Sequence, residues 1–243
     1  MLVTGGSRGI GAATAALAAK NGYDVAVNYR EDERAASAIV EAVRSNGVRG
    51  LAIKADVAIE ADVVRMFEAV DTFGRLKALV NNAGITGGFA RVADLKGPAL
   101  ERMLAVNVIG TILCSREAVR RLSTVWGGDG GSIVNLSSLA AKLGGGGEWV
   151  HYAASKGAIQ SFTIGLAREV AAEGVRVNAV AAGIVDTEMH LAAGDPHRAK
   201  RTGATVPIGR AATPHEIAEA IIWLCSPAAS YVTGTILEAG GGR

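Results

Sequence analysis

Short apolar runs and helix-like periods alternate from one end of the chain to the other. Seven runs rich in valine, isoleucine, leucine and alanine predict β-strands at residues 2–4, 24–29, 49–55, 76–81, 132–137, 175–181 and 236–239. Apolar side chains at successive positions are typical of strands that are buried on both faces of a parallel sheet.

The segments between these strands have the period of amphipathic helices. One face of residues 63–70 is apolar, and Gly74 ends that pattern. Long helices are expected at residues 98–123 and 151–172. The sequence Thr-Pro-His-Glu at 213–216 is typical of a helix start, with a capping threonine, a proline in the first turn and a glutamate that can close a capping box.

This alternation predicts a single-domain α/β Rossmann fold over residues 1–243, with a doubly wound seven-stranded parallel sheet and helices on both faces. No Ser/Pro/Gly-rich linker divides the chain, and residues 187–210 resemble an inserted substrate loop. In such a sheet ligands bind beyond the carboxyl ends of the strands, so the segments that follow the strands are the candidate site.

Composition narrows the class of protein. The net charge of +2 leaves no basic stripe, which argues against nucleic acid as the main partner. With no leader sequence and no uninterrupted apolar run of membrane-spanning length, the chain is expected in the cytoplasm without a membrane partner. The four histidines lack ligand spacing, so no metal site is predicted. Cys114 and Cys225 are predicted to be buried free thiols.

A glycine-rich turn at residues 4–11 connects the first strand to the first helix. Gly5 permits a tight turn, Gly9 lets the backbone approach a phosphate, and Gly11 allows close packing between helix and strand. The free N–H groups and the positive dipole end of the following helix favour an anion. The strand–turn–helix context therefore predicts nucleotide binding rather than a merely structural turn.

Further motifs follow in order along essentially the whole chain: Asp56-Val57, Asn81-Asn82-Ala83-Gly84, a mid-helix Asn107, Ser137-Ser138, Tyr152-x-x-x-Lys156 and Tyr231-Val232-Thr233-Gly234. Together with the glycine turn they resemble the short-chain dehydrogenase/reductase family, especially bacterial members grouped with glucose dehydrogenases and 3-oxoacyl carrier-protein reductases. The resemblance implies an oxidoreductase that acts on a ketone or secondary alcohol with a nicotinamide cofactor. It also implies a homotetramer.

The choice of cofactor can be argued from charge. NAD enzymes usually place a carboxylate at the end of the second strand, which would repel a 2′-phosphate. Here that stretch contains Tyr29 and Arg30, with no acid before Glu31, and Arg8 lies in the glycine turn. Two guanidinium groups favour NADP(H), while NAD(H) remains possible. Alternatively, both arginines are solvated surface residues.

The resemblance implies the remaining cofactor contacts. Asp56 would accept a hydrogen bond from the adenine, Val57 would donate one from its backbone, and Asn81–Gly84 would lie along the ribose. The full set of expected cofactor residues is Gly5, Ser7, Arg8, Gly9, Ile10, Tyr29, Arg30, Asp56, Val57, Asn82, Ala83, Gly84, Tyr152, Lys156, Gly183, Ile184 and Thr187.

Tyr152 and Lys156 are four residues apart on a predicted helix, so their side chains project from one face. A free tyrosine has a pKa of about 10, and a nearby ammonium is expected to lower it. The resemblance adds Ser138 as the hydroxyl that holds the substrate oxygen, with Ser137 as the alternative. It also adds Asn107 as a water-holding link to Lys156; otherwise Asn107 marks a locally satisfied helix kink.

One departure from the family pattern is Ala182 before Gly183, where the family usually has proline, and it is expected to loosen the following loop modestly. Substrate choice is expected to depend on residues 87–94, 143–150 and 188–209. Two other functions remain open at this point: a non-catalytic NADP(H)-binding sensor or scaffold of the same fold, and a methyltransferase, for which the segment Tyr29-Arg30 is unsuitable.

Overall fold

A computed structural model describes the backbone of all 243 residues and the side chains of all of them except His190 and Ala192. Its centre is one parallel sheet in the order β3-β2-β1-β4-β5-β6-β7. The strands are β1 Leu2–Val3, β2 Val25–Tyr29, β3 Gly50–Lys54, β4 Ala78–Asn81, β5 Gly131–Ser138, β6 Val175–Ala182 and β7 Ile236–Ala239. All seven predicted strands are confirmed, and the strand order reverses direction between β1 and β4.

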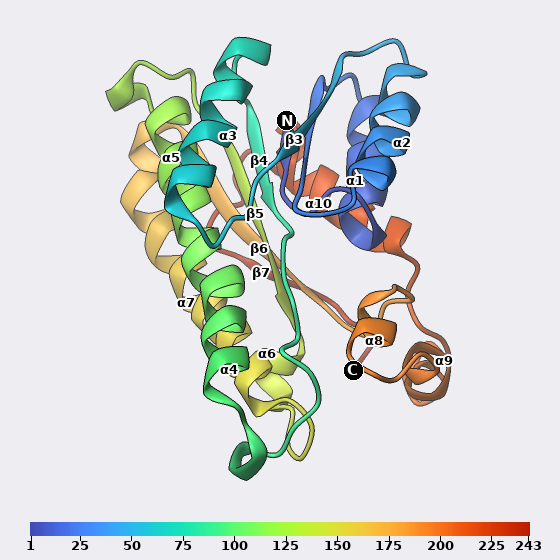
Figure 1. Ribbon diagram of the computed structural model, residues 1–243. Coiled ribbons are helices and arrows are strands. Elements are labelled where there is room, and N and C mark those ends of the chain that lie inside the picture. Colours follow the sequence, from blue (N-terminus) through green and yellow to red (C-terminus); the bar gives the residue numbers. More distant parts are fainter.

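Helices cover both faces of the sheet (Figure 1). One layer consists of α1 Gly9–Lys20, α2 Glu33–Arg44 and α10 Pro214–Cys225, and the other of α3 Glu60–Phe73, α5 Thr111–Leu122 and α7 Val150–Val170. The shorter helices are α4 Gly97–Leu104, α6 Ala140–Leu143, α8 Met189–Ala192 and α9 Arg198–Gly203. The doubly wound Rossmann fold predicted from the sequence is therefore confirmed.

Successive strand residues supply two separate cores, because neighbouring side chains on a strand point to opposite faces. In β1, Leu2 packs into the core on the α3 and α5 side, whereas Val3 packs into the core on the α1 and α10 side. Both side chains are fully buried. The capping box predicted at Thr213 and Glu216 is present at the start of α10.

The long helix predicted at residues 98–123 is not continuous as an α-helix. A π-helical turn, Ala105–Gly110, separates α4 from α5. A Cβ atom on Gly110 would lie 2.8 Å from the carbonyl oxygen of Val57, so only glycine lets this wide turn approach the segment after β3 so closely. The pattern of apolar residues predicts helix here and does not distinguish the two helix types.

The helical stretch Gly97–Leu122 is the one part of the described chain that is long and apolar enough, by length and composition, to cross a membrane. Part of its apolar surface is exposed, at Leu104, Ile109 and Ile112. α5 also has a row of charged residues, in which buried Glu117 pairs with Arg121. The absence of a membrane partner remains a prediction.

Candidate functional site

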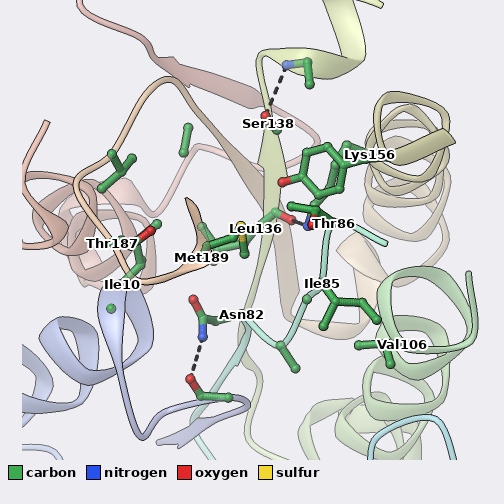
Figure 2. A pocket seen from close by; sticks show the side chains of 18 of the residues that line it. Ile10, Asn82, Ile85, Thr86, Val106, Leu136, Ser138, Lys156, Thr187 and Met189 are labelled. Carbon is green, nitrogen blue, oxygen red and sulfur yellow. Dashed lines mark hydrogen bonds between the residues drawn. The ribbon is translucent and has the colours of Figure 1, made fainter. Parts of the chain in front are cut away.

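A cavity of about 910 Å³ lies beyond the carboxyl ends of the strands and extends from the glycine turn to α7. Every residue expected at the cofactor lines it: Gly5, Ser7, Arg8, Gly9, Ile10, Tyr29, Arg30, Asp56, Val57, Asn82, Ala83, Gly84, Tyr152, Lys156, Gly183, Ile184 and Thr187. Ser138 lines it too, whereas Asn107 lies behind its wall. Figure 2 shows Ser138 and Lys156 in one part of this cavity and Ile10 and Asn82 in another.

The glycine turn is tied to the end of β4 by Asn82. Its side-chain amide donates to the carbonyl oxygens of Thr4 and Gly5, both at 2.9 Å. Gly5 and Gly9 have φ angles of 59° and 54°, a region that favours glycine. A Cβ atom on Gly11 would lie 2.4 Å from both the Asn82 amide nitrogen and the Gly5 oxygen. Gly11 thus allows the helix to pack against the turn and Asn82.

The residues around this turn fit the phosphates of a dinucleotide. No side chain caps the N-terminus of α1, and its first turn contains no acidic residue, so N–H groups and the positive dipole end are available to an anion. The space beside Gly9 is open to a ligand, since the nearest atom to a Cβ added there would be a methyl carbon of Thr187 at 3.4 Å.

The expected 2′-phosphate site differs in one respect from the sequence argument. Arg8 and Arg30 both line the cavity, but Arg30 forms an ion pair with Glu31. Glu31 and Asp32 also line the cavity. The expected 2′-phosphate site therefore contains carboxylates as well as Arg8 and Arg30, whereas the sequence argument counted only the two arginines. Asp32 is engaged as the N-cap of α2, accepting from the Ala35 N–H at 2.8 Å.

Asp56 has a charged partner that the sequence did not reveal. Arg102, from α4, donates to the Asp56 carboxylate at 2.7 Å, and the Ala58 N–H donates at 3.0 Å. Burial alone would raise the pKa of Asp56, but these hydrogen bonds outweigh it and the pKa is lowered. Arg102 lines the cavity beside the expected adenine residue. No motif marks it, because the contact joins segments that are distant in the sequence.

Tyr152, Ser138 and Lys156 meet where β5 ends against α7. The Ser138 and Tyr152 side chains are hydrogen-bonded, and the Lys156 ammonium lies 5.7 Å from the Tyr152 ring centroid. The Lys156 Nζ donates to the carbonyl oxygen of Leu136 at 2.7 Å. The chain between Ser138 and Tyr152 includes a glycine turn at 144–147, where three glycines have positive φ.

Ser137, the alternative to Ser138, also lines the cavity, but its hydroxyl is engaged by α7. Its hydroxyl donates to the carbonyl oxygen of Lys156 at 3.1 Å and accepts from the side chain of Gln160. Ser138 also accepts a hydrogen bond from the Ala140 N–H at 3.1 Å, so it caps a turn as well as contacting Tyr152. The geometry therefore favours Ser138 as the hydroxyl available to a substrate.

Asn107 lies in the π-helical turn with its amide fully engaged. The amide oxygen accepts from the Ile85 N–H at 2.9 Å, and the nitrogen donates to the Ile85 carbonyl at 2.9 Å and to the Ser155 hydroxyl at 3.0 Å. Asn107 thus joins the segment after β4 to α7, one residue from Lys156. These contacts agree with the alternative that Asn107 lies at a helix kink where its amide is hydrogen-bonded locally. Its role in holding a water molecule remains a prediction.

Burial sets the pKa of both ionisable groups. Burial raises the pKa of Tyr152 to about 12, partly offset by the hydrogen bond from Ser138, and lowers the pKa of Lys156 to about 8. For the protein groups alone, the pKa of Tyr152 is therefore raised, whereas the sequence argument expected a nearby ammonium to lower it; desolvation outweighs the hydrogen bond from Ser138. At neutral pH Tyr152 is therefore protonated and able to donate a proton.

A cluster of aromatic and charged side chains lies next to Tyr152. The Trp149 ring centroid is 5.5 Å from that of Tyr152 and 4.9 Å from that of Phe89, which stacks on it. Arg198, from α9, places its guanidinium 4.2 Å from the Trp149 ring centroid and pairs with Glu148 at 2.6 Å. These contacts bring together the three segments that were expected to determine substrate choice.

Comparison with known proteins decides the family. The family model described as Enoyl-(Acyl carrier protein) reductase matches residues 5–243. A short-chain dehydrogenase from Burkholderia cenocepacia J2315, solved in complex with NADP, has a TM-score of 0.91 and 36% identity, with 99% of this chain and 96% of that chain covered. This chain belongs to the short-chain dehydrogenase/reductase family.

Two relatives show how closely this family member resembles other oxidoreductases. The uncharacterized oxidoreductase YgfF of Escherichia coli K12 is 49% identical over 243 residues, covering 100% of this chain and 98% of the relative. The 3-oxoacyl-[acyl-carrier-protein] reductase FabG of Staphylococcus aureus Mu50 is 36% identical over 242 residues, covering 99% and 96%. The resemblance inferred from the motifs is confirmed.

Ala182, the departure from the usual pattern of this family, is held in the sheet. Its carbonyl oxygen accepts from the Leu139 N–H at 3.0 Å, and the Gly183 N–H donates to the Ala239 carbonyl at 2.9 Å. A Cβ atom on Gly183 would lie 2.9 Å from the backbone of Gly240, which explains the glycine. Any loosening caused by the absence of proline would therefore begin after Gly183.

The buried ammonium of Lys156 predicts a pH dependence in this short-chain dehydrogenase/reductase. With its pKa at about 8, Lys156 loses its charge as pH rises through 8, and kcat/KM for the reduced nicotinamide cofactor is expected to fall over that range. Arginine stays protonated at all these pH values, so Lys156→Arg is expected to lose this limb of the profile even if its activity is lower. An unchanged limb in Lys156→Arg would contradict the assignment.

Proposed function

We propose that this protein is an NADP(H)-dependent oxidoreductase that reduces a ketone, or oxidises the corresponding secondary alcohol. One observation supports this more than any other. A protonated, buried Tyr152 lies between a serine hydroxyl and a lysine ammonium, at the end of a cavity whose opposite side is a phosphate-binding glycine turn.

The chain's own residues have distinct roles in this reaction. Ser138 and Tyr152 hold the ketone oxygen by hydrogen bonds, and Tyr152 donates its phenolic proton to the oxygen as negative charge develops there. Lys156 binds the nicotinamide ribose and stabilises the phenolate that remains on Tyr152. Asn107 fixes the segment after β4 against α7 and, as the family pattern implies, holds the water that returns the proton. NADPH, when bound, supplies the hydride to the carbonyl carbon.

The choice of NADP(H) over NAD(H) rests on Arg8 and Arg30, which line the cavity beyond the end of β2. The relative from Burkholderia cenocepacia, solved with NADP, supports the same choice. Glu31 is neutralised by Arg30 in the ion pair, which reduces its repulsion of a 2′-phosphate. We infer that NADPH is preferred and that NADH is a poorer but usable cofactor.

Substitution of Arg30 tests this preference. Arg30→Ala removes one guanidinium and releases Glu31 from its ion pair, so the KM for NADPH is expected to rise about 10- to 100-fold, with little change for NADH. Arg34→Ala, in the first turn of α2, exposed and outside the cavity lining, is the matched control and should change neither constant. Equal changes for both cofactors would show that Arg30 does not contact the 2′-phosphate.

The homotetramer expected from the family belongs to this proposal. Exposed apolar side chains on two helical surfaces support self-association: Ile109 in the π-helical turn and Ile112 on α5, and Trp223 on α10. Tyr231, in the C-terminal segment, is fully exposed in the single chain. Light scattering on the purified protein is expected to give four times the chain mass, and a mass equal to one chain would contradict it.

The direct test is NADPH consumption against a panel of ketones, diketones, quinones and oxoacyl thioesters, together with the reverse reaction on alcohols and sugars. Turnover of any carbonyl substrate, with the alcohol as product, supports the proposal. If NADPH raises the melting temperature but no substrate turns over in either direction, the protein is better described as an NADP(H)-binding sensor or scaffold.

A further inference from the structure

Arg198 is the unusual residue of the cavity wall. It lies at the first position of the short helix α9, yet its side chain is 9% exposed. It borders both the main cavity and a smaller hollow of about 320 Å³ on the side of Phe89 and Asp195. Arg201, on the same helix and also ion-paired, has a side chain that is 61% exposed, so the burial of Arg198 calls for an explanation.

The Arg198 guanidinium has a hydrogen-bond donor without a partner. Its Nη2 donates to one oxygen of Glu148 at 2.6 Å, while its Nε is buried and has no hydrogen-bond partner among the described residues. Nε and Nη2 lie on the same edge of the guanidinium plane, and that edge matches the two oxygens of one carboxylate. An unpaired buried donor costs free energy, so a ligand that pairs with it is favoured.

Glu148 is a partner that can be displaced. Its side chain is 46% exposed, so it can return to water with little loss, whereas the Arg198 side chain cannot. The rings of Trp149 and Phe89 pack against the guanidinium, which lies 4.2 Å from the Trp149 centroid and 5.2 Å from the Phe89 centroid. Arg198 is therefore fixed in place while one of its edges faces an exchangeable acid.

We propose that the substrate has a carboxylate remote from the reacting carbonyl and that Arg198 binds it through Nε and Nη2, displacing Glu148. This inference rests on the proposed reductase function. The Trp149 ring contacts both groups, with its centroid 4.2 Å from the Arg198 guanidinium and 5.5 Å from the Tyr152 ring centroid. One substrate of moderate length can therefore reach both Arg198 and Tyr152. The substrate class is an oxo acid with several carbons between the two groups.

The test compares acids with their uncharged esters. Reduction of 4-oxopentanoate, 5-oxohexanoate and 6-oxoheptanoate by NADPH is measured beside that of each methyl ester. For at least one chain length, kcat/KM for the acid is expected to exceed that for the ester by about 10- to 100-fold. In Arg198→Met that ratio is expected to fall to about 1, because the acid loses its partner while the ester does not.

Two further variants distinguish a role of Arg198 in substrate binding from a purely structural ion pair with Glu148. Glu148→Gln removes the competing acid, so the preference for the acid should stay or increase. Lys200→Met, exposed on the same helix, should leave it unchanged. If Arg198→Met and Glu148→Gln instead lower kcat/KM for the acid and for the ester equally, the Arg198–Glu148 ion pair only stabilises the fold and the proposal is wrong. Equal rates for acid and ester in the wild type would also overturn it.

A binding measurement distinguishes this failure from failure of the proposed reductase. Hexanoate and methyl hexanoate contain no ketone, and their effect on the melting temperature is measured with NADP⁺ present. Hexanoate is expected to stabilise the wild type more than the ester does, and Arg198→Met is expected to abolish the difference. The absence of any difference in the wild type contradicts the carboxylate site, whether or not a ketone is reduced.

Discussion

Tyr152→Phe is expected to lower kcat for ketone reduction by about 10²- to 10⁴-fold, the usual contribution of a positioned proton donor. The substitution removes only the hydroxyl, so the ring can still pack against Trp149, 5.5 Å away between centroids. Binding of NADPH, followed by protein fluorescence, should be nearly unchanged. The kinetics are measured with the best substrate of the carbonyl panel.

A second tyrosine provides the matched control. Tyr231 is fully exposed in the single chain and is not among the residues that line the cavity, so Tyr231→Phe should retain wild-type kcat. If Tyr152→Phe also retained it, another group would have to donate the proton. The proposed role of Tyr152 would then be wrong even if the protein reduced ketones.

Gly11→Ala is expected to weaken NADPH binding by roughly 100-fold, because a lost hydrogen bond that leaves a buried polar group unpaired costs about 1 to 3 kcal/mol. The new methyl carbon would lie 2.4 Å from both the Asn82 amide and the Gly5 oxygen, and neither can move without breaking a hydrogen bond of the turn. The dissociation constant of NADPH and the melting temperature report the two parts of this effect.

Gly165→Ala is the control for this substitution. Gly165 lies inside α7, and a Cβ atom added there would meet no atom within 4 Å. Alanine is the better helix former, so Gly165→Ala should raise the free energy of unfolding by about 0.5 to 1 kcal/mol and leave NADPH binding unchanged. Normal NADPH binding by Gly11→Ala would contradict the tight approach of helix and turn.

The fold was predictable because its signals are local. Strands buried on both faces are continuous apolar runs, and the capping box at Thr213 lies within four residues of sequence. The lining of the cavity was predictable for a related reason: most of the residues expected there follow the end of a strand, and the carboxyl ends of parallel strands converge at one edge. Tyr152 and Lys156, by contrast, lie on α7. The buried thiols Cys114 and Cys225 are confirmed on the same grounds.

The features that escaped prediction depend on contacts between distant segments. Arg102 and Arg198 look like any surface arginine in the sequence, and only the folded chain places them against Asp56 and Trp149. The π-helical turn at Asn107 has the same apolar period as the α-helix around it. Likewise, the pKa of Tyr152 depends on its burial, whereas the sequence shows only that a lysine is near.

The central claim, hydride transfer from NADPH to a carbonyl carbon, is tested most directly with NADPH deuterated on both hydrogens at C4 of the nicotinamide. The products are analysed by mass spectrometry. We predict an alcohol with one deuterium on the carbinol carbon, formed by the wild type and reduced in amount by Tyr152→Phe in parallel with kcat. An alcohol without deuterium, or bound NADPH that transfers nothing to any carbonyl, would contradict the account.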